Sequence, residues 1–367
     1  MAAQPHVLIA LHQLGGGGVE RVTLHLANGL ARRGNRVSLV LLRSGGVLEN
    51  QVEAAVDVIR PASGAPADRG LGLLRAVRPL ARAIQRLEPD VLLSPGNHMH
   101  PLVLLAHRRA ALERCLLALK FTNPVQRSSA GRLRNAIRGG FFRYAADQAG
   151  LILTLSETSR LEAAALAPQA AGKIRIVDNP YVEDRLLTRK RRPAKVDPPL
   201  LLSVGRLTEQ KDPLMLIEAM AGLSDRPWRL AMLGDGPLRS ACEARARALG
   251  IGHRVEFAGF VADPAPWFDK ARLFLLSSRF EELPAVLFEA MVARCSIVST
   301  ASSPAVVNLL DQGRLGRIVP PADAGAFRAA VAHALDDLSP TPIPGAWIKR
   351  FTIGSGVASH AEALGLS

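Results

Sequence analysis

Short apolar runs alternate with helix-length amphipathic segments along the whole chain, and this alternation most constrains the fold. The runs have the length and the Val, Ile and Leu content of buried strands. Parallel strands need long crossover connections, so the alternation predicts parallel sheets covered by helices on both faces. The predicted strands are residues 7–11, 37–42, 91–94, 115–121, 151–156 and 174–177, then 200–204, 229–233, 255–257, 273–277, 296–300 and 317–319.

The length of 367 residues exceeds what one hydrophobic core usually supports, so two domains are expected. RLLTRKRRPAKVDPP, residues 185–199, is basic, proline-rich and aperiodic, which is typical of a linker. We predict an α/β protein with two Rossmann-like, doubly wound domains facing a central cleft. The boundaries are 1–184, a linker at 185–198, a second domain at 199–345 and a final helical segment at 346–367.

Composition disfavours several classes of protein. The cysteines, at positions 115, 242 and 295, fit neither a disulfide framework nor a zinc site. No basic leader precedes the first apolar run and no run is long enough to span a bilayer, so we expect a cytoplasmic protein. The net charge of +14 indicates an anionic partner: nucleic acid, an acidic membrane face or a phosphorylated substrate. With 4% aromatic residues and no nucleic-acid-binding signature, nucleic acid is disfavoured.

A glycine-rich turn, HQLGGGGVERV at residues 12–22, joins the first predicted strand to a predicted helix over 19–33. Glycines let a backbone approach a ligand closely, and the free N–H groups of a helix start attract anions. Val19, Glu20 and Arg21 follow the glycines, so the turn lacks both the dinucleotide fingerprint and the Gly-Lys-Ser/Thr ending of a triphosphate loop. The residues alone leave a ligand-binding turn and a plain tight turn as equal alternatives.

Two cations lie in the loop of LLLSVGRLTEQKDPLMLIEAM, residues 200–220. Arg206 and Lys211 come between a predicted strand and a helix that Asp212 is expected to cap, with Pro213 in its first turn. Fixed cations at the carboxyl end of a strand suit a diphosphate and stabilise it as a leaving group. Two solvated basic side chains are the alternative.

A second glycine turn follows the next predicted strand in RLAMLGDGPLR, residues 229–239. Gly234 and Gly236 permit the close approach of a sugar ring or a ribose. We expect Asp235, between them, to cap the following helix.

Two glutamates lie eight positions apart in SSRFEELPAVLFEAM, residues 277–291. Pro284 fits the first turn of a helix, which places Glu289 in its second turn and Glu281 in the loop before it. Glycosidases use such carboxylate pairs as acid and nucleophile, although rarely on one loop–helix unit of an open parallel sheet. Alternatively, the two oxygens of Glu289 accept hydrogen bonds from a ribose diol while Glu281 faces a sugar. Glu282 is better described as a capping acid.

In this order, GGGGVERV, SVGRLTEQKD, LGDGPLR, FAGFV, SSRFEELPAVLFEAM and GRIVPPAD resemble the retaining glycosyltransferases of family 4, of the glycosyl transferases group 1. The resemblance is strongest over 199–330 and weaker over 5–180. It implies the GT-B architecture, with an acceptor-binding first domain and a nucleotide-sugar-binding second domain. It also implies that the final helix, in 346–367, returns to the first domain.

The resemblance also implies roles for single residues. Arg206, Lys211 and Glu281 form the catalytic set, in which the two cations hold the donor diphosphate and Glu281 meets the donor sugar. Glu289 binds the ribose, and Gly17 and Gly18 lie against the phosphates or the acceptor. The further donor-binding residues are Gly234, Asp235, Leu283 and Pro284, and the acceptor side comprises Glu20, His98, Lys120 and Asn123.

Three features depart from the family pattern. Glu282 replaces a usual glycine, and SSPAVV at 302–307 lacks the usual glycine and acidic residue. The usual histidine after the strand at 115–121 is absent from LALKFTNP, which leaves Lys120 or Asn123 in its region. His98 and His100, after the preceding strand, are weaker substitutes.

The implied reaction is transfer of a hexose-type sugar, with retention, from a nucleotide sugar, expected to be a UDP-sugar. The expected acceptor is a saccharide or lipid-linked saccharide in surface polysaccharide or glycolipid synthesis. Neither a metal nor another cofactor is expected, and no Asp-x-Asp pair is present to anchor a metal. The alternatives are a UDP-sugar 2-epimerase of the same architecture and a catalytically weak nucleotide-sugar-binding partner subunit.

Basic charge is concentrated over 114–146, which has seven Lys or Arg residues and no Asp or Glu. Within it, 127–144 fits an amphipathic helix that binds the anionic inner face of the cell membrane. An ordinary surface helix that packs its apolar stripe on the domain is the alternative. The stripe consists of Leu133, Ile137, Phe141 and Tyr144, flanked by Arg134 and Arg138.

Overall fold

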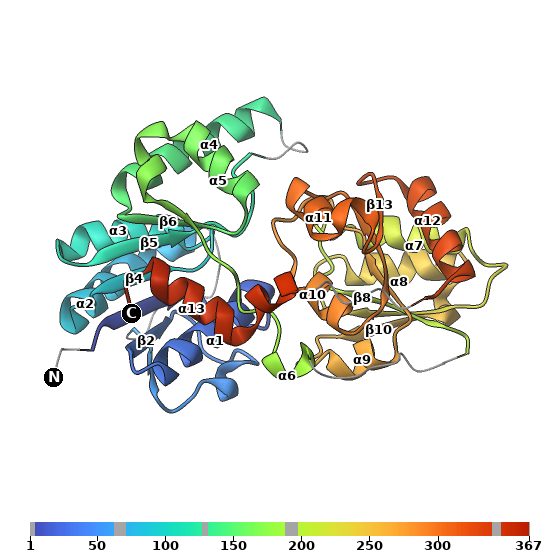
Figure 1. Cartoon of the computed structure of the whole chain (residues 1–367), viewed down its shortest axis with the longest axis horizontal. Helices are drawn as coiled ribbons and strands as arrows, with labels where there is room; N and C mark the ends of the chain where they lie inside the picture. Colours follow the sequence, from blue (N-terminus) through green and yellow to red (C-terminus); the bar gives the residue numbers. More distant parts are fainter. Residues whose placement is uncertain (1–3, 62–70, 127–130, 188–196, 340–345, 367) are drawn as a thin grey trace. The chain divides into compact units, whose positions relative to one another are not determined.

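The structure is a computed structural model that describes residues 4–61, 71–126, 131–187, 197–339 and 346–366. It divides into two compact units (Figure 1). Unit 1 comprises residues 1–183 and 350–367, and unit 2 comprises residues 184–349. Positions 188–196 of the predicted linker, and 127–130 of the predicted amphipathic segment, lie outside the described residues.

Unit 1 is built on a parallel sheet in the order β3-β2-β1-β4-β5-β6-β7. The chain lays down β2 and β3 on one side of β1 and the later strands on the other, so the order reverses between β1 and β4. The strands are β1 (His6–Leu11), β2 (Arg36–Leu41), β3 (Val56–Ile59), β4 (Val91–Ser94), β5 (Leu116–Lys120), β6 (Leu151–Thr154) and β7 (Ile174–Ile176).

Helices cover both faces of this sheet, so every residue of β1 is buried. A strand with one solvent-exposed face would instead alternate between buried and exposed residues. Leu8 and Ala10 belong to a core that also contains side chains of α2, α3, α4 and α5. The other cover is formed by α1 and the last helix, α13, which lie side by side (Figure 1). The helices are α1 (Gly18–Arg32), α2 (Val77–Leu87), α3 (His100–Ala110), α4 (Arg132–Gln148), α5 (Glu157–Leu166) and α13 (Ile353–Ala363).

Unit 2 contains a parallel sheet in the order β10-β9-β8-β11-β12-β13, which reverses between β8 and β11. Trp228 and Phe327 are buried in a core beneath α7, α8 and α12. The strands are β8 (Leu200–Val204), β9 (Arg229–Leu233), β10 (Val255–Gly259), β11 (Leu273–Leu276), β12 (Ser296–Thr300) and β13 (Arg317–Val319). The helices are α6 (Asp184–Leu187), α7 (Pro213–Ala221), α8 (Arg239–Ala248), α9 (Ala265–Lys270), α10 (Ala285–Val292), α11 (Pro304–Leu309) and α12 (Ala324–Asp336).

Every strand expected from the sequence is present, and the sheets have the predicted doubly wound, parallel organisation. The prediction missed β3, a short edge strand in which only Val56 is buried. Within the described residues, no helix combines the length and the apolarity needed to cross a membrane.

Candidate functional site

The reversal of strand order in unit 2 lies between β8 and β11, and ligands of open α/β sheets bind beyond the carboxyl ends of such strands. The β8–β11 ladder ends early, with Leu202 opposite Phe274. The flanking ladders continue to Val204 on β8 and Leu276 on β11. The loops after β8 and β11, which contain the predicted catalytic residues, therefore leave the sheet at this point.

Lys211 and Glu281 come together across these two loops. The Nζ of Lys211 lies 2.5 Å from Oε1 of Glu281, and Ser278 Oγ donates to the same oxygen at 2.9 Å. The Glu281 side chain is only 9% exposed and that of Lys211 24%. A buried carboxylate needs such compensation, because an isolated buried charge is costly. The ammonium has three donors, so it can bind a second anionic group beside Glu281.

Arg206 supplies a second positive charge in the loop after β8, and its side chain is exposed. In the part of the chain that the structure describes, no hydrogen bond or ion pair is found for its guanidinium. A Cβ atom on the preceding Gly205 would lie 3.2 Å from Cε of Lys211, so the lysine stem lies against the backbone beside Arg206. The two cations therefore belong to one compact stretch of loop.

The sequence predicted that Asp212 caps α7, and this prediction is wrong. It occupies the N-cap position with φ 47° and ψ 53°, but its side chain makes no capping hydrogen bond. Instead its carboxylate binds Arg279 of the β11 loop, at 2.8 Å from Nε and 3.3 Å from Nη2. This hydrogen bonding raises the pKa of the Arg279 guanidinium. The charge of the partner decided the orientation of the side chain, because a bidentate ion pair is stronger than a capping bond.

Glu289 lies in the second turn of α10, as predicted, and is partly buried. Pro284 is the N-cap residue of α10, one position before the first turn where it was predicted. Leu283, just before it, is partly exposed. Glu282 is 3% exposed, and its carbonyl oxygen accepts from Ser303 Oγ at 3.2 Å. The capping role expected of its side chain stays a prediction.

Asp235 does not cap α8, because α8 begins at Arg239 with Leu238 as its N-cap residue. The carboxylate accepts a hydrogen bond from the backbone N–H of Gly236 at 2.7 Å. Its other oxygen lies 3.5 Å from Nη1 of Arg239. Asp235 is thus held by its own turn.

Positions 234 and 236 are glycines because the backbone of the β8 loop leaves no space for a Cβ atom. A Cβ atom on Gly234 would lie 2.1 Å from the carbonyl oxygen of Gly205, and one on Gly236 would lie 2.4 Å from that of Leu207. Gly234 also has φ 130°, which other residues rarely adopt. The β8 loop therefore excludes a side chain at both positions, and the close approach of a sugar or ribose stays a prediction.

The glycine turn of unit 1 joins β1 to α1, with Gly17 as the N-cap residue. A Cβ atom on Gly17 would lie 2.3 Å from Oε2 of Glu20, whereas one on Gly18 would meet nothing within 4 Å. Glu20 stands at the third helical position, where a glutamate reaches back over the helix start. Its carboxylate therefore lies where an incoming phosphate would be repelled.

His98 lies in the loop after β4, at the strand reversal of unit 1, and is partly buried. A Cβ atom on the nearby Gly96 would lie 3.0 Å from a methyl group of Val19 in α1, so this loop packs against the first turn of α1. Asn97 accepts hydrogen bonds from the backbone N–H and the hydroxyl of Thr122, at 2.8 and 3.1 Å. The loops after β4 and β5 are thereby joined next to Asn123, which is partly buried.

Lys120 does not reach toward a ligand, contrary to its predicted place on the acceptor side. It is 1% exposed, and its Nζ lies 2.9 Å from Nε2 of His360 in α13. As the last residue of β5, it points into the interior of unit 1, where the returning helix covers it.

Sequence reasoning missed Ser277 and Arg279, which bind the β8 loop, and Ser278, which holds Glu281 within the β11 loop. The available signal was their position directly after an apolar strand at the predicted edge of the sheet. A group of three or more His, Cys, Asp or Glu side chains suited to a metal ion is not found among the described residues.

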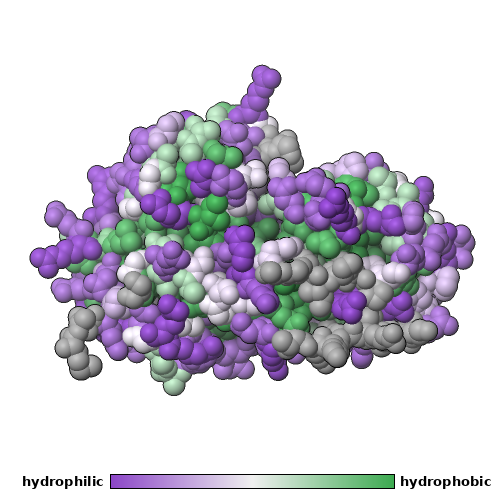
Figure 2. Space-filling model, in the orientation of Figure 1, coloured by the Kyte–Doolittle hydropathy of each residue, from purple (hydrophilic) through white to green (hydrophobic). Residues whose placement is uncertain are grey.

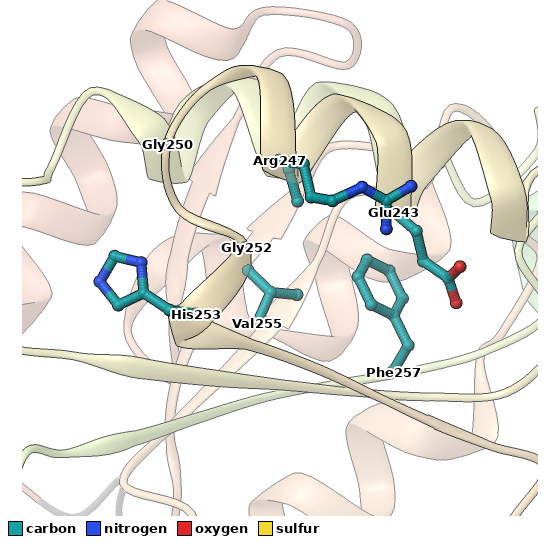
Figure 3. Close-up of a pocket in the computed structure, with 8 residues that line it drawn as sticks. Glu243, Arg247, Gly250, Gly252, His253, Val255 and Phe257 are labelled. Carbon is teal, nitrogen blue, oxygen red and sulfur yellow. The ribbon is translucent and has the colours of Figure 1, made fainter.

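A pocket of about 550 Å³ lies elsewhere in unit 2 (Figure 3). It is formed by the C-terminal half of α8, the turn after it and the edge strand β10, with Glu243, Arg247 and Phe257 in its wall. Its residues at 250–255 precede or begin β10, so it extends toward the amino end of the strand. Ligands of open α/β sheets bind at the loops that follow the carboxyl ends of the strands, which is the opposite end. The pocket also contains none of the predicted site residues.

Two family models match the chain. Glycosyltransferase Family 4 matches residues 16–185, and Glycosyl transferases group 1 matches residues 198–337. The lipopolysaccharide core biosynthesis glycosyltransferase LpsE of Rhizobium meliloti is 28% identical over 327 residues, covering 88% of this chain and 87% of LpsE. A Campylobacter jejuni alpha-1,4-N-acetyl-D-galactosaminyltransferase, named for a saccharide on PP-undecaprenol, is 30% identical over 141 residues, covering 38% of this chain and 39% of that enzyme.

Among solved structures, Anabaena HepE in complex with UDP and glucose superimposes with a TM-score of 0.77 at 18% identity. The match covers 98% of this chain and 99% of HepE, which shows a shared fold. Together the two family models account for most of both domains, and both relatives of this chain are named as glycosyltransferases. The chain therefore belongs to the GT-B glycosyltransferases of the family 4 type.

Proposed function

We propose that this glycosyltransferase moves a hexose-type sugar from a UDP-sugar to a saccharide or lipid-linked saccharide, with retention at the anomeric carbon and without a metal ion. The names of LpsE and of the Campylobacter enzyme support an acceptor in surface polysaccharide or glycolipid synthesis. The HepE structures, in complex with UDP and with UDP-glucose, support UDP as the nucleotide of the donor.

The Lys211–Glu281 ion pair at the strand reversal, beside the exposed Arg206, carries the proposal. The donor diphosphate takes the free donors of the Lys211 ammonium and the guanidinium of Arg206. As the bond between the anomeric carbon and the diphosphate oxygen breaks, negative charge grows on the leaving group, and fixed cations stabilise it. The acceptor oxygen bonds to the same face of the anomeric carbon, and its proton passes to the departing phosphate.

The remaining roles follow from position. Glu289 accepts hydrogen bonds from the two ribose hydroxyls, and Glu281, held by Lys211 and Ser278, meets the donor sugar. Gly17 and Gly18 are assigned to the acceptor rather than to the phosphates, because the Glu20 carboxylate lies beside Gly17.

Release of UDP tests the function directly. The enzyme is incubated with each of a panel of UDP-sugars and with lipid-linked or oligosaccharide acceptors, and UDP is measured. Arg206→Met and Lys211→Met are expected to abolish release, whereas Arg245→Met, which removes an exposed cation from α8, leaves it unchanged. An NMR spectrum of donor incubated alone detects a 2-epimerase, since only that enzyme alters the donor without an acceptor. Absence of turnover and of binding with every nucleotide sugar would contradict the proposal.

The proposed partner of unit 1 is an anionic membrane surface on the cytoplasmic side. Of the four stripe residues of α4, Phe141 packs against the core of unit 1, while Leu133, Ile137 and Tyr144 are exposed by 75%, 64% and 41%. Figure 2 shows hydrophobic side chains over α4 and α5 among hydrophilic ones. Exposed arginines at 132, 134 and 143 accompany them. An apolar stripe beside basic residues is the pattern that binds anionic lipid.

A further inference from the structure

The ion pair between Asp212 and Arg279 joins the two loops that carry the proposed catalytic residues. Arg279 is two positions before Glu281, and Asp212 directly follows Lys211. Both oxygens of the Asp212 carboxylate accept from the guanidinium, at 2.8 and 3.3 Å. The aspartate side chain is 6% exposed, while that of Arg279 is 48% exposed. The arginine therefore reaches inward from the surface to a buried charge.

The sheet does not fix the relative position of these loops. The β8–β11 ladder ends at Leu202 and Phe274, and Lys211 lies nine residues beyond its end on one strand. Glu281 lies seven residues beyond the end on the other. Over such lengths a loop is held only by what it contacts, so interactions between the loops decide where the lysine and the glutamate lie.

Besides the Lys211–Glu281 contact, four interactions join these loops at neighbouring positions in the described part of the chain. Three of them use the backbone: Ser277 Oγ donates to Lys211 O at 2.7 Å, Arg279 N donates to Gln210 O at 2.8 Å, and Gln210 Nε2 donates to Phe280 O at 3.1 Å. The fourth is the Asp212–Arg279 pair. It is charged and bidentate, and such pairs are stronger and more specific in geometry than neutral hydrogen bonds.

Asp212 uses its side chain for this pair and not for capping α7. Its φ of 47° lies in the left-handed region, which is unfavourable for residues other than glycine, asparagine and aspartate. An aspartate before a helix ordinarily stabilises it by capping, and this one makes no such bond. The residue forgoes a capping interaction, in a backbone conformation that aspartate tolerates, and its carboxylate contacts Arg279 instead.

We propose that Asp212 and Arg279 are positioning residues, which hold Lys211 and Glu281 in the geometry that the transfer reaction needs. This inference rests on the proposed function. When the donor diphosphate engages Lys211, the Lys211–Glu281 contact is shared or lost. The Asp212–Arg279 pair does not involve the ammonium, and it keeps the two loops together through the reaction.

A double-mutant cycle tests the coupling. Arg279→Met retains most of the side-chain length, and Asp212→Asn retains a residue that tolerates the left-handed conformation, so both variants are expected to fold. Each single change lowers kcat at saturating donor by at least about tenfold, because displacements of about 1 Å are this costly in catalysis. The double variant loses no more than the worse single variant, since both changes remove the same interaction. Arg279→Lys recovers part of kcat.

Arg245→Met is the matched control. Arg245 pairs with Glu218 at 3.1 Å, both on the surface of unit 2, and its side chain is 45% exposed. If Arg279→Met changes the melting temperature but leaves kcat like that of Arg245→Met, or if the two losses multiply in the double variant, the pair is merely structural and the inference is wrong. If wild-type protein releases no UDP from any donor, the proposed function fails. The inference is then judged from crystal structures of wild type and Arg279→Met: it predicts that Lys211 and Glu281 separate beyond about 4 Å, the limit of an ion pair, and unchanged contact overturns it.

Discussion

Lys120 Nζ lies 2.9 Å from Nε2 of His360, and both residues are buried in unit 1. His360 Nδ1 lies 2.8 Å from the carbonyl oxygen of Gly356, which can only accept, so Nδ1 carries the proton and Nε2 accepts from the lysine. The contact ties the end of β5 to α13, 240 positions later in the chain. Lys120, which was predicted to face a ligand, therefore binds α13 instead.

The burial of Lys120 predicts that the free energy of unfolding rises with pH. Burial lowers the pKa of Lys120 to about 7, whereas the unfolded chain keeps a value of about 10.4. Between these values the unfolded state binds more protons, so the free energy of unfolding increases with pH, by at most about 1.4 kcal/mol per unit. Burial, and then the charge of Lys120, lower the pKa of His360 as well, so stability falls further below about pH 6.5.

Melting temperatures of wild type and Lys120→Met between pH 7 and 10 measure this effect. The methionine fills the space without a titrating group, so the variant is expected to lose most of the rise over that interval. An equal rise in both proteins would show that the buried lysine is not its source.

Gly356 of α13 is predicted to tolerate no side chain. A Cβ atom there would lie 2.5 Å from Pro180 N and 2.7 Å from Pro180 Cα, and backbone atoms cannot swing aside. Gly356→Ala should lower the free energy of unfolding by about 1–3 kcal/mol, the usual range for overpacking. Gly140→Ala in α4 is the control: it meets nothing within 4 Å and should stabilise its helix by about 0.5–1 kcal/mol. Urea unfolding of the three proteins decides between these outcomes, and equal midpoints for wild type and Gly356→Ala refute the prediction.

Glu289→Ala is predicted to weaken the binding of UDP by about tenfold or more, because two hydrogen bonds to a charged acceptor are lost. The comparison ligand is 2′,3′-dideoxy-UDP, which lacks both ribose hydroxyls. Calorimetry should find that wild type and Glu289→Ala bind this analogue equally. A loss of the same size for both ligands would mean that the glutamate acts elsewhere than on the ribose.

Membrane binding by α4 predicts that Leu133→Ser with Ile137→Ser reduces co-sedimentation with vesicles containing phosphatidylserine or phosphatidylglycerol. Each residue is more than half exposed, so folding should be little affected. Leu74→Ser, at a position that is 50% exposed in another part of unit 1, should leave binding unchanged. Neutral vesicles should bind wild type weakly, since the arginines then lack a counter-charge. Equal sedimentation of all three proteins would exclude α4 as the contact.

The sequence by itself determined the doubly wound sheets and the loops that follow their strands. Periodicity and composition are local properties, so they can be recognised without knowing which residues are in contact. It also placed Lys211 in a loop and Glu289 in the second turn of a helix, since proline and the flanking strands set those positions.

Only the tertiary structure decided where the polar side chains point. Asp212 was predicted to cap a helix and binds Arg279, 67 positions away. Gly234 was predicted to lie against a ligand, and the structure adds that the carbonyl of Gly205 excludes a side chain there. Lys120 was predicted to face an acceptor and is covered by His360. In each case the deciding partner is distant in the chain, and the free energy of burying a charge or packing a backbone outweighs the local preference that the sequence displays.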